Sequence, residues 1–133
     1  MDKLYARSVF FVRDAERSLQ FYKETLGFSV NWTHLEQGRV YVFQASPLGF
    51  ELILNQVDPS IENRPGHGRV FIGLEVDQSA AFYRHVEERG IRTTVEQWGG
   101  PTLVVRDLDE NELFIWLADS ERERLQSRLQ VSP

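Results

Sequence analysis

Short apolar runs alternate with two stretches of helical spacing along the chain. Runs of β-branched and aromatic residues with period-two alternation are typical of strands. Such runs predict strands at 6–13, 28–33, 39–45, 50–55, 69–76, 91–97, 101–106 and 112–117. Helical spacing predicts helices over 14–26 and 77–89. Each is followed by a glycine, Gly27 or Gly90, which ends a helix by adopting a left-handed conformation.

The same order of elements occurs twice. Ser18 is followed by Phe21-Tyr22, and Ser79 is followed at the same offsets by Phe82-Tyr83. An internal repeat with a period of roughly 63 residues indicates a duplicated module, because solenoid repeats are shorter. Each module reads strand–helix–strand–strand–strand. The expected organisation is a single domain over 1–133 with these parts in order: module 5–55, linker 56–68, module 69–118 and polar helix 119–130.

Composition limits the classes of function. The chain has 133 residues, which suits one domain, and no cysteine, which excludes disulfides and thiolate metal sites. Its net charge of −5 supplies no basic face for nucleic acid. No apolar run approaches the ~20 residues that cross a bilayer, and the charged segment 1–7 is unlike a secretion signal, so we expect a cytoplasmic protein. Aromatic residues make up 12% of the chain, which indicates a large apolar cavity or interface.

Four short motifs carry a family resemblance. They are Val12-Arg13-Asp14, Leu26-Gly27-Phe28, Val76-Asp77 and the turn Arg106-Asp107-Leu108-Asp109-Glu110-Asn111. Together with the doubled βαβββ order, they resemble the vicinal oxygen chelate superfamily of glyoxalases, bleomycin-resistance proteins and dioxygenases. The resemblance implies an α+β fold, in which two βαβββ modules form curled half-barrels around a cleft and a short C-terminal helix follows.

The resemblance also implies where a metal ion would bind. The metal enzymes of this family place one ligand on each of four cleft-facing strands, and the corresponding residues here are Arg7, Glu51, Phe71 and Phe114. Arg7 carries a fixed positive charge, which repels a cation, and the two phenylalanines have no lone pair to donate. Only Glu51 matches the family pattern, so we expect no metal cofactor.

Strand alternation predicts what lines the cleft in place of a metal. If these four positions face inward, every second residue on the same strands faces inward too, and four aromatic residues near strand ends join them. The expected ligand-binding residues are Arg7, Phe11, Trp32, Tyr41, Phe43, Glu51, Phe71, Trp98, Phe114 and Trp116. The intervening residues form the apolar layer under the helices: Phe10, Val12, Leu52, Leu54, Ile72, Leu74, Leu113 and Ile115. Flat rings stack on planar or cationic molecules, whereas a solid aromatic core is the alternative interpretation.

These features favour a metal-free protein that binds a small aromatic molecule without chemistry, in a homodimer, as the resemblance to the bleomycin-resistance proteins implies. No residue is identified as catalytic. The alternative is a lyase, isomerase or dioxygenase with a displaced or incomplete metal site, for which only Glu51, Glu112 and His67 offer donors. Glu51 and Glu75 favour a cationic ligand, whereas Arg7 suits a carboxylate or phosphate.

Overall fold

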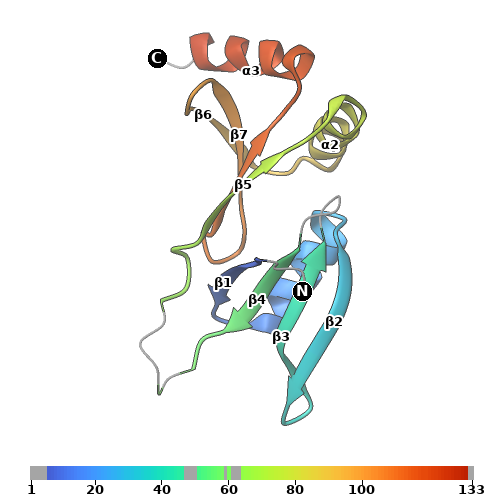
Figure 1. Ribbon diagram of the computed structural model, residues 1–133, viewed down its shortest axis with the longest axis vertical. Helices are drawn as coiled ribbons and strands as arrows, with labels where there is room; N and C mark the ends of the chain where they lie inside the picture. The colour runs from blue at the N-terminus through green and yellow to red at the C-terminus, as the bar shows by residue number, and fades with distance from the viewer. Residues whose placement is uncertain (1–5, 47–50, 59, 61–63, 132–133) are drawn as a thin grey trace, which may run out of the picture. The chain divides into compact units, whose positions relative to one another are not determined.

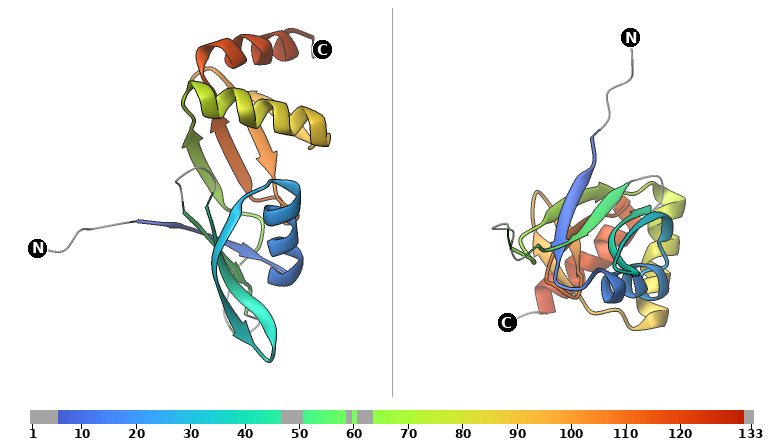
Figure 2. Two further views of the ribbon diagram at one scale, coloured as in Figure 1. Left: turned by 90° about the vertical axis from the view of Figure 1, so that its right-hand side faces the viewer. Right: turned by 90° about the horizontal axis from the view of Figure 1, so that it is seen from below.

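The computed structural model describes residues 6–46, 51–58, 60 and 64–131. The chain forms two compact units (Figures 1 and 2): residues 1–68 with 107–111 make unit 1, and residues 69–106 with 112–133 make unit 2. Each unit contains one four-stranded sheet, so the duplicated βαβββ module predicted from the sequence is confirmed. None of the helices in the described ranges combines the length and the hydropathy of a membrane-spanning helix.

Unit 1 is a curled, unclosed sheet with helical turns packed on one face. Its elements are β1 (Ser8–Val12), α1 (Ala15–Gln20), the π-helical η1 (Phe21–Thr25), β2 (Ser29–Glu36), β3 (Arg39–Ser46) and β4 (Leu52–Gln56). The strand order is β1-β4-β3-β2, with β1 parallel to β4 and the other neighbours antiparallel. Asp14 caps α1 by accepting a hydrogen bond from the Arg17 amide. Gly27 follows with a φ of 76°, so the helix predicted over 14–26 is present, with a π-helical second half.

Unit 2 repeats this strand order. Its elements are β5 (Arg69–Gly73), α2 (Val76–Arg89), β6 (Thr93–Gln97), β7 (Pro101–Arg106), β8 (Glu112–Trp116) and α3 (Asp119–Val131). The order β5-β8-β7-β6, with β5 parallel to β8, corresponds to that of unit 1. The strand predicted at 69–76 ends at Gly73, because Glu75 already begins α2 through a capping box with Gln78. Gly90 ends α2 with a φ of 61°, as predicted.

The apolar layer under the helices is close to the one predicted. Its buried members are Phe10, Val12, Leu52, Leu54, Ile72, Leu113 and Ile115. Leu74 is only half-buried, because it lies beyond the end of β5. Burying a side chain of this size stabilises the fold by roughly 1.5–3 kcal/mol. The opposite face of each sheet, here called its open face, carries the candidate site.

The turn between β7 and β8 packs within unit 1. Its Asp107 is 4% exposed and accepts a hydrogen bond from the Tyr22 hydroxyl at 2.8 Å. Asn111 donates to the carbonyl of Phe11 at 3.1 Å and accepts from the amide of Gly68 at 2.8 Å. Burial raises the pKa of Asp107, and its hydrogen bonds with Asn111 and Tyr22 only partly offset that increase. The turn motif is therefore a buried hydrogen-bond centre of unit 1.

Candidate ligand-binding site

Four aromatic side chains meet on the open face of the unit 2 sheet. The ring centroid of Phe71 lies 5.4 Å from that of Trp98 and 6.0 Å from that of Trp116. Trp98 also meets Phe114 edge to face, with centroids 5.4 Å apart. Phe71 and Trp98 are 47% and 48% exposed, whereas Phe114 is 3% exposed. These four residues, here called the aromatic cluster, were all predicted from the sequence as ligand-binding residues.

Strand register and a glycine turn bring the aromatic cluster together. Phe71 on β5 is the register partner of Phe114 on β8, and Trp116 faces the same way two residues further along β8. Trp98 follows β6, and its amide donates to the carbonyl of Gly100 at 2.9 Å. Gly100 has a φ of 154°, and a Cβ there would lie 2.8 Å from the Trp116 ring. Only a glycine therefore allows the turn to approach Trp116 this closely.

A network of charged side chains borders the aromatic cluster. The Arg69 guanidinium lies 4.6 Å from the ring centroid of Phe114 and donates two hydrogen bonds to Glu112, the shorter at 2.7 Å. Arg106 donates to the other Glu112 oxygen at 2.9 Å and to Glu96 at 3.4 Å. Burial raises the pKa of Glu112, but the hydrogen bonds and charges of Arg69 and Arg106 outweigh it and lower that pKa overall. Glu112 is therefore ionised and engaged at neutral pH.

Two arginines lie over rings of the aromatic cluster and were missed by the sequence reasoning, Arg69 and Arg122. Arg69 lies two residues before Phe71, so the alternation that placed Phe71 on the open face also places Arg69 there. Arg122 lies 4.4 Å from the ring centroid of Trp116. No local pattern indicates it, because the contact depends on how α3 packs. Strand alternation therefore predicts the position of Arg69, whereas the packing of α3 sets that of Arg122.

The open face of unit 1 carries an ion pair and a buried amide. Arg7 donates a hydrogen bond to Glu51, so the two predicted charges meet and balance one another. Trp32 on β2 is 41% exposed. Its register partner Gln44 is 4% exposed and donates to Asn31 at 3.2 Å, while the Gln44 Oε1 atom has no hydrogen-bond partner. This face therefore combines polar groups with the exposed ring of Trp32.

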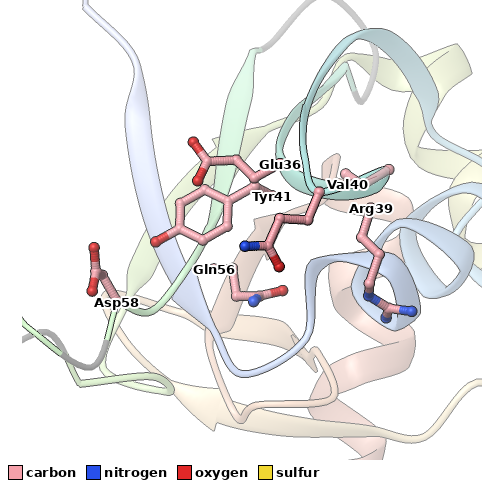
Figure 3. Close-up of a pocket in the computed structure, with 7 residues that line it drawn as sticks. Glu36, Arg39, Val40, Tyr41, Gln56 and Asp58 are labelled. Atoms are coloured by element: carbon pink, nitrogen blue, oxygen red, sulfur yellow. The ribbon is translucent and has the colours of Figure 1, made fainter.

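Three other predicted site residues also belong to unit 1, and Phe11 shares the face of β1 that carries Val9. Phe11 is half-buried on β1. Phe43 is fully buried, with its ring centroid 6.1 Å from that of Tyr22, because it shares a face with its register partner Leu54 in the helix-side layer. Phe43 thus belongs to the core and not to the open face. Tyr41 lines a separate cavity at the end of the β2–β3 hairpin (Figure 3).

The positions implied as metal-ligand sites carry side chains already engaged in these contacts. Arg7 is bonded to Glu51, and Phe71 and Phe114 belong to the aromatic cluster. In the part of the chain that the structure describes, no three side chains among His, Asp and Glu come together as a group suited to a metal ion.

Comparison with known families assigns the chain to a superfamily. The model of the Glyoxalase/Bleomycin resistance protein/Dioxygenase superfamily matches residues 5–114. The chain belongs to this superfamily, also called the vicinal oxygen chelate superfamily. No curated protein matches the sequence.

Solved structures from bacteria share the fold at low sequence identity. The bleomycin-binding protein of Streptomyces verticillus, complexed with copper(II)-bleomycin, is 17% identical, with 90% of this chain and 99% of that chain covered and a TM-score of 0.61. TnmS3, an antibiotic-binding protein from Streptomyces sp. CB03234, is 23% identical over 90% of this chain and 100% of that chain, with a TM-score of 0.59. Lactoylglutathione lyase from Agrobacterium tumefaciens is 13% identical over 86% and 93% of the two chains, with a TM-score of 0.60. Binding proteins and an enzyme thus share this fold, and only the site distinguishes their functions.

Proposed function

We propose that the protein binds a small aromatic molecule on the open face of unit 2 and catalyses no reaction on it. The observation that carries this proposal is the exposure of Phe71 and Trp98, whose adjacent rings are nearly half accessible. The two rings are tilted by 47° to one another, and the accessible face of either ring can stack on a planar ligand. The bleomycin-binding and antibiotic-binding proteins that share the fold support the same class of function.

The proposed binding requires no metal ion. Phe71 and Phe114 occupy two positions at which the family resemblance implies metal ligands, and their rings supply no donor atom. At a third such position, the Arg7 guanidinium repels a cation. Of these two side chains in unit 2, Phe71 is one of the exposed rings of the stacking surface, and the buried Phe114 supports the other exposed ring, Trp98, edge to face.

Stacking, and not net charge, is the proposed basis of recognition. The sequence favoured a cationic ligand because of Glu51 and Glu75. Glu51 is paired with Arg7, and the Glu75 side chain caps α2 by accepting from the Gln78 amide. The charge of Glu51 is therefore offset by Arg7, and the Glu75 carboxylate is directed to the start of α2, so neither acid is offered as the basis of recognition at this site.

Loss of Trp98 is expected to weaken ligand binding. Trp98→Ala removes one of the two exposed rings, and a stacked aromatic contact of about 1–1.5 kcal/mol corresponds to an increase in Kd of about tenfold. Calorimetric titration with bleomycin, 9-aminoacridine and naphthalene-2-sulfonate, each with and without EDTA, measures this effect. Circular dichroism reports whether the variant is folded.

Trp32→Ala is the matched control, because Trp32 is similarly exposed but lies on the sheet of unit 1. Its Kd is expected to change less than twofold. If Trp32→Ala weakens binding and Trp98→Ala does not, the site lies on unit 1. Failure of all three compounds to bind the wild-type chain would overturn the proposal, and loss of binding in EDTA would contradict its metal-free form.

We also infer that two copies of the chain associate. Apart from the rings of the ligand site, Val9 and Trp32 are apolar side chains left exposed on the open face of unit 1, and exposed apolar surface marks contacts with a ligand or a partner. A two-fold dimer is the commonest arrangement among soluble homo-oligomers. Sedimentation at micromolar concentration is expected to give about twice the chain mass of 15.5 kDa, and a single species at the chain mass would contradict the inference.

A further inference from the structure

A cavity of about 330 Å³ lies at the end of the unit 1 sheet, where the β2–β3 hairpin turns and β4 ends (Figure 3). Its walls are made by Glu36, Gln37, Arg39, Val40, Tyr41, Gln56 and Asp58. The cavity is separate from the open-face ion pair, because Glu51 precedes β4 whereas Gln56 ends that strand. It is also separate from the aromatic cluster, all of whose residues belong to unit 2.

The walls of the cavity are anchored to the start of α1. The Val40 amide donates to the Glu16 carboxylate at 2.7 Å, and the Gln56 side-chain oxygen accepts from the Ala15 amide at 3.1 Å. These bonds tie β3 and the end of β4 to the same helical turn. The cavity is therefore a formed feature of the fold and not a gap between independent loops.

One aromatic ring and two carboxylates define the chemistry of the cavity. Figure 3 shows the Glu36 carboxylate beside the Tyr41 ring and the Tyr41 hydroxyl directed toward Asp58. Partial burial raises the pKa of Tyr41, and the negative charges of Asp58 and Glu36 raise it further. Two hydrogen bonds from Ser60 lower the pKa of Asp58, so this carboxylate stays ionised at neutral pH.

The cation in the wall does not cancel this negative field. Arg39 extends to the N-terminus of α1, where its guanidinium contacts Asp14 at 3.4 Å. His34 contacts Glu36 at 3.1 Å from outside the cavity lining, and this contact is an ion pair only when the imidazole is protonated. With Arg39 directed to its own carboxylate, Glu36 and Asp58 leave an excess of negative charge around the Tyr41 ring.

We propose that this cavity is a second binding site, which takes a small organic ammonium ion. The ion would lie against the face of Tyr41 and between the carboxylates of Glu36 and Asp58. An aromatic face attracts a cation through its quadrupole, and the two carboxylates add a Coulombic attraction that salt weakens. The inference is independent of aromatic binding on unit 2, because it rests on different residues of a different sheet.

Choline and its uncharged isostere 3,3-dimethyl-1-butanol test the proposal directly. Backbone amide NMR spectra of the full chain are recorded during titration with each compound. Choline is expected to shift the resonances of residues 36–41 and 56–58 saturably, and more weakly at 0.5 M NaCl than at low salt. The isostere, which has the same shape without the charge, is expected to leave them unchanged.

Variants then assign the contacts. Glu36→Gln and Asp58→Asn are each expected to weaken choline binding about two- to fivefold, as the loss of an exposed ion pair does. Tyr41→Leu is expected to weaken it by a similar factor through loss of the aromatic face. Glu88→Gln removes an exposed charge from α2 of unit 2 and is the matched control, with no change expected.

Three results would overturn the proposal: no saturable shifts with choline, equal shifts with the isostere, or unchanged choline affinity in both carboxylate variants. Shifts confined to the aromatic cluster would assign the cation to unit 2 and would also reject this cavity. The spectrum of each variant without ligand shows whether it is folded, so a folding defect is not mistaken for lost binding.

Discussion

Replacing Asp107 with alanine is expected to lower the free energy of unfolding by about 4 kcal/mol, measured by urea denaturation. Asp107 accepts from the Tyr22 hydroxyl, from the amides of Asp109 and Asn111, and from the Asn111 side chain, all at 2.8–3.0 Å. Tyr22 is fully buried. Each buried donor left without an acceptor costs about 1–3 kcal/mol. Because all of these donors share Asp107 as their acceptor, the alanine variant leaves every one of them without it.

Two variants separate the hydrogen bonds of Asp107 from its charge. Glu110→Gln changes an exposed acid in the same turn and is expected to have little effect. Asp107→Asn retains one acceptor oxygen and is expected to be destabilised less than Asp107→Ala. An effect of Asp107→Ala as small as that of Glu110→Gln would show that the turn is not a stabilising centre.

The stability of the wild type relative to Asp107→Asn is expected to change with pH in one direction. Burial raises the pKa of Asp107 above its ordinary value of 3.8, so the folded state holds this proton more tightly than the unfolded state. The contribution of Asp107 to the free energy of unfolding is therefore lost as the pH rises from 3.8 through the raised pKa. The difference in stability between the wild type and Asp107→Asn is expected to shrink over that range, and a difference that grows there would contradict the assignment.

Gly66→Ala is expected to destabilise the protein by about 3 kcal/mol or more. Gly66 has a φ of 84°, which side-chain-bearing residues rarely adopt, and a Cβ there would overlap the carbonyl oxygen of Asp109. Neither group can move cheaply, since both belong to the backbone beside the Asp107 hydrogen bonds. Overpacking of this kind adds about 1–3 kcal/mol to the conformational cost.

Gly38→Ala isolates the conformational part of this effect. Gly38 has a φ of 77°, close to that of Gly66, but a Cβ there would have no neighbour within 4 Å. Thermal and urea unfolding are expected to show a loss of about 1 kcal/mol for Gly38→Ala. If the two variants lose the same stability, the close approach of Gly66 to the 107–111 turn is not a significant constraint.

Features that depend only on neighbouring residues could be predicted from the sequence. Helix ends at Gly27 and Gly90 followed from the left-handed conformation that glycine adopts easily. Period-two alternation placed Phe71 and Phe114 on one face and Ile72 on the other, because successive side chains of a strand point to opposite sides. The repeat of these local patterns was enough to predict two βαβββ modules.

The tertiary structure alone decided which of the predicted aromatic residues are accessible. Phe43 packs against Tyr22 in the core, and Phe114 is covered by Trp98 and by Arg69 on the neighbouring strand. Register and packing set these contacts, and the alternation of residues along one strand gives no information about either.

The turn between β7 and β8 gives the clearest physical reason for this limit. Its motif was visible in the sequence as a family resemblance, but Asp107 bonds to Tyr22 across 85 residues of chain, and Arg13 bonds to Asp109 across 96. Local periodicity reports only which face of its own element a side chain occupies. Which residue it contacts on that face depends on how distant elements pack. The hydrogen-bond centre of unit 1 could therefore be recognised only in the folded structure.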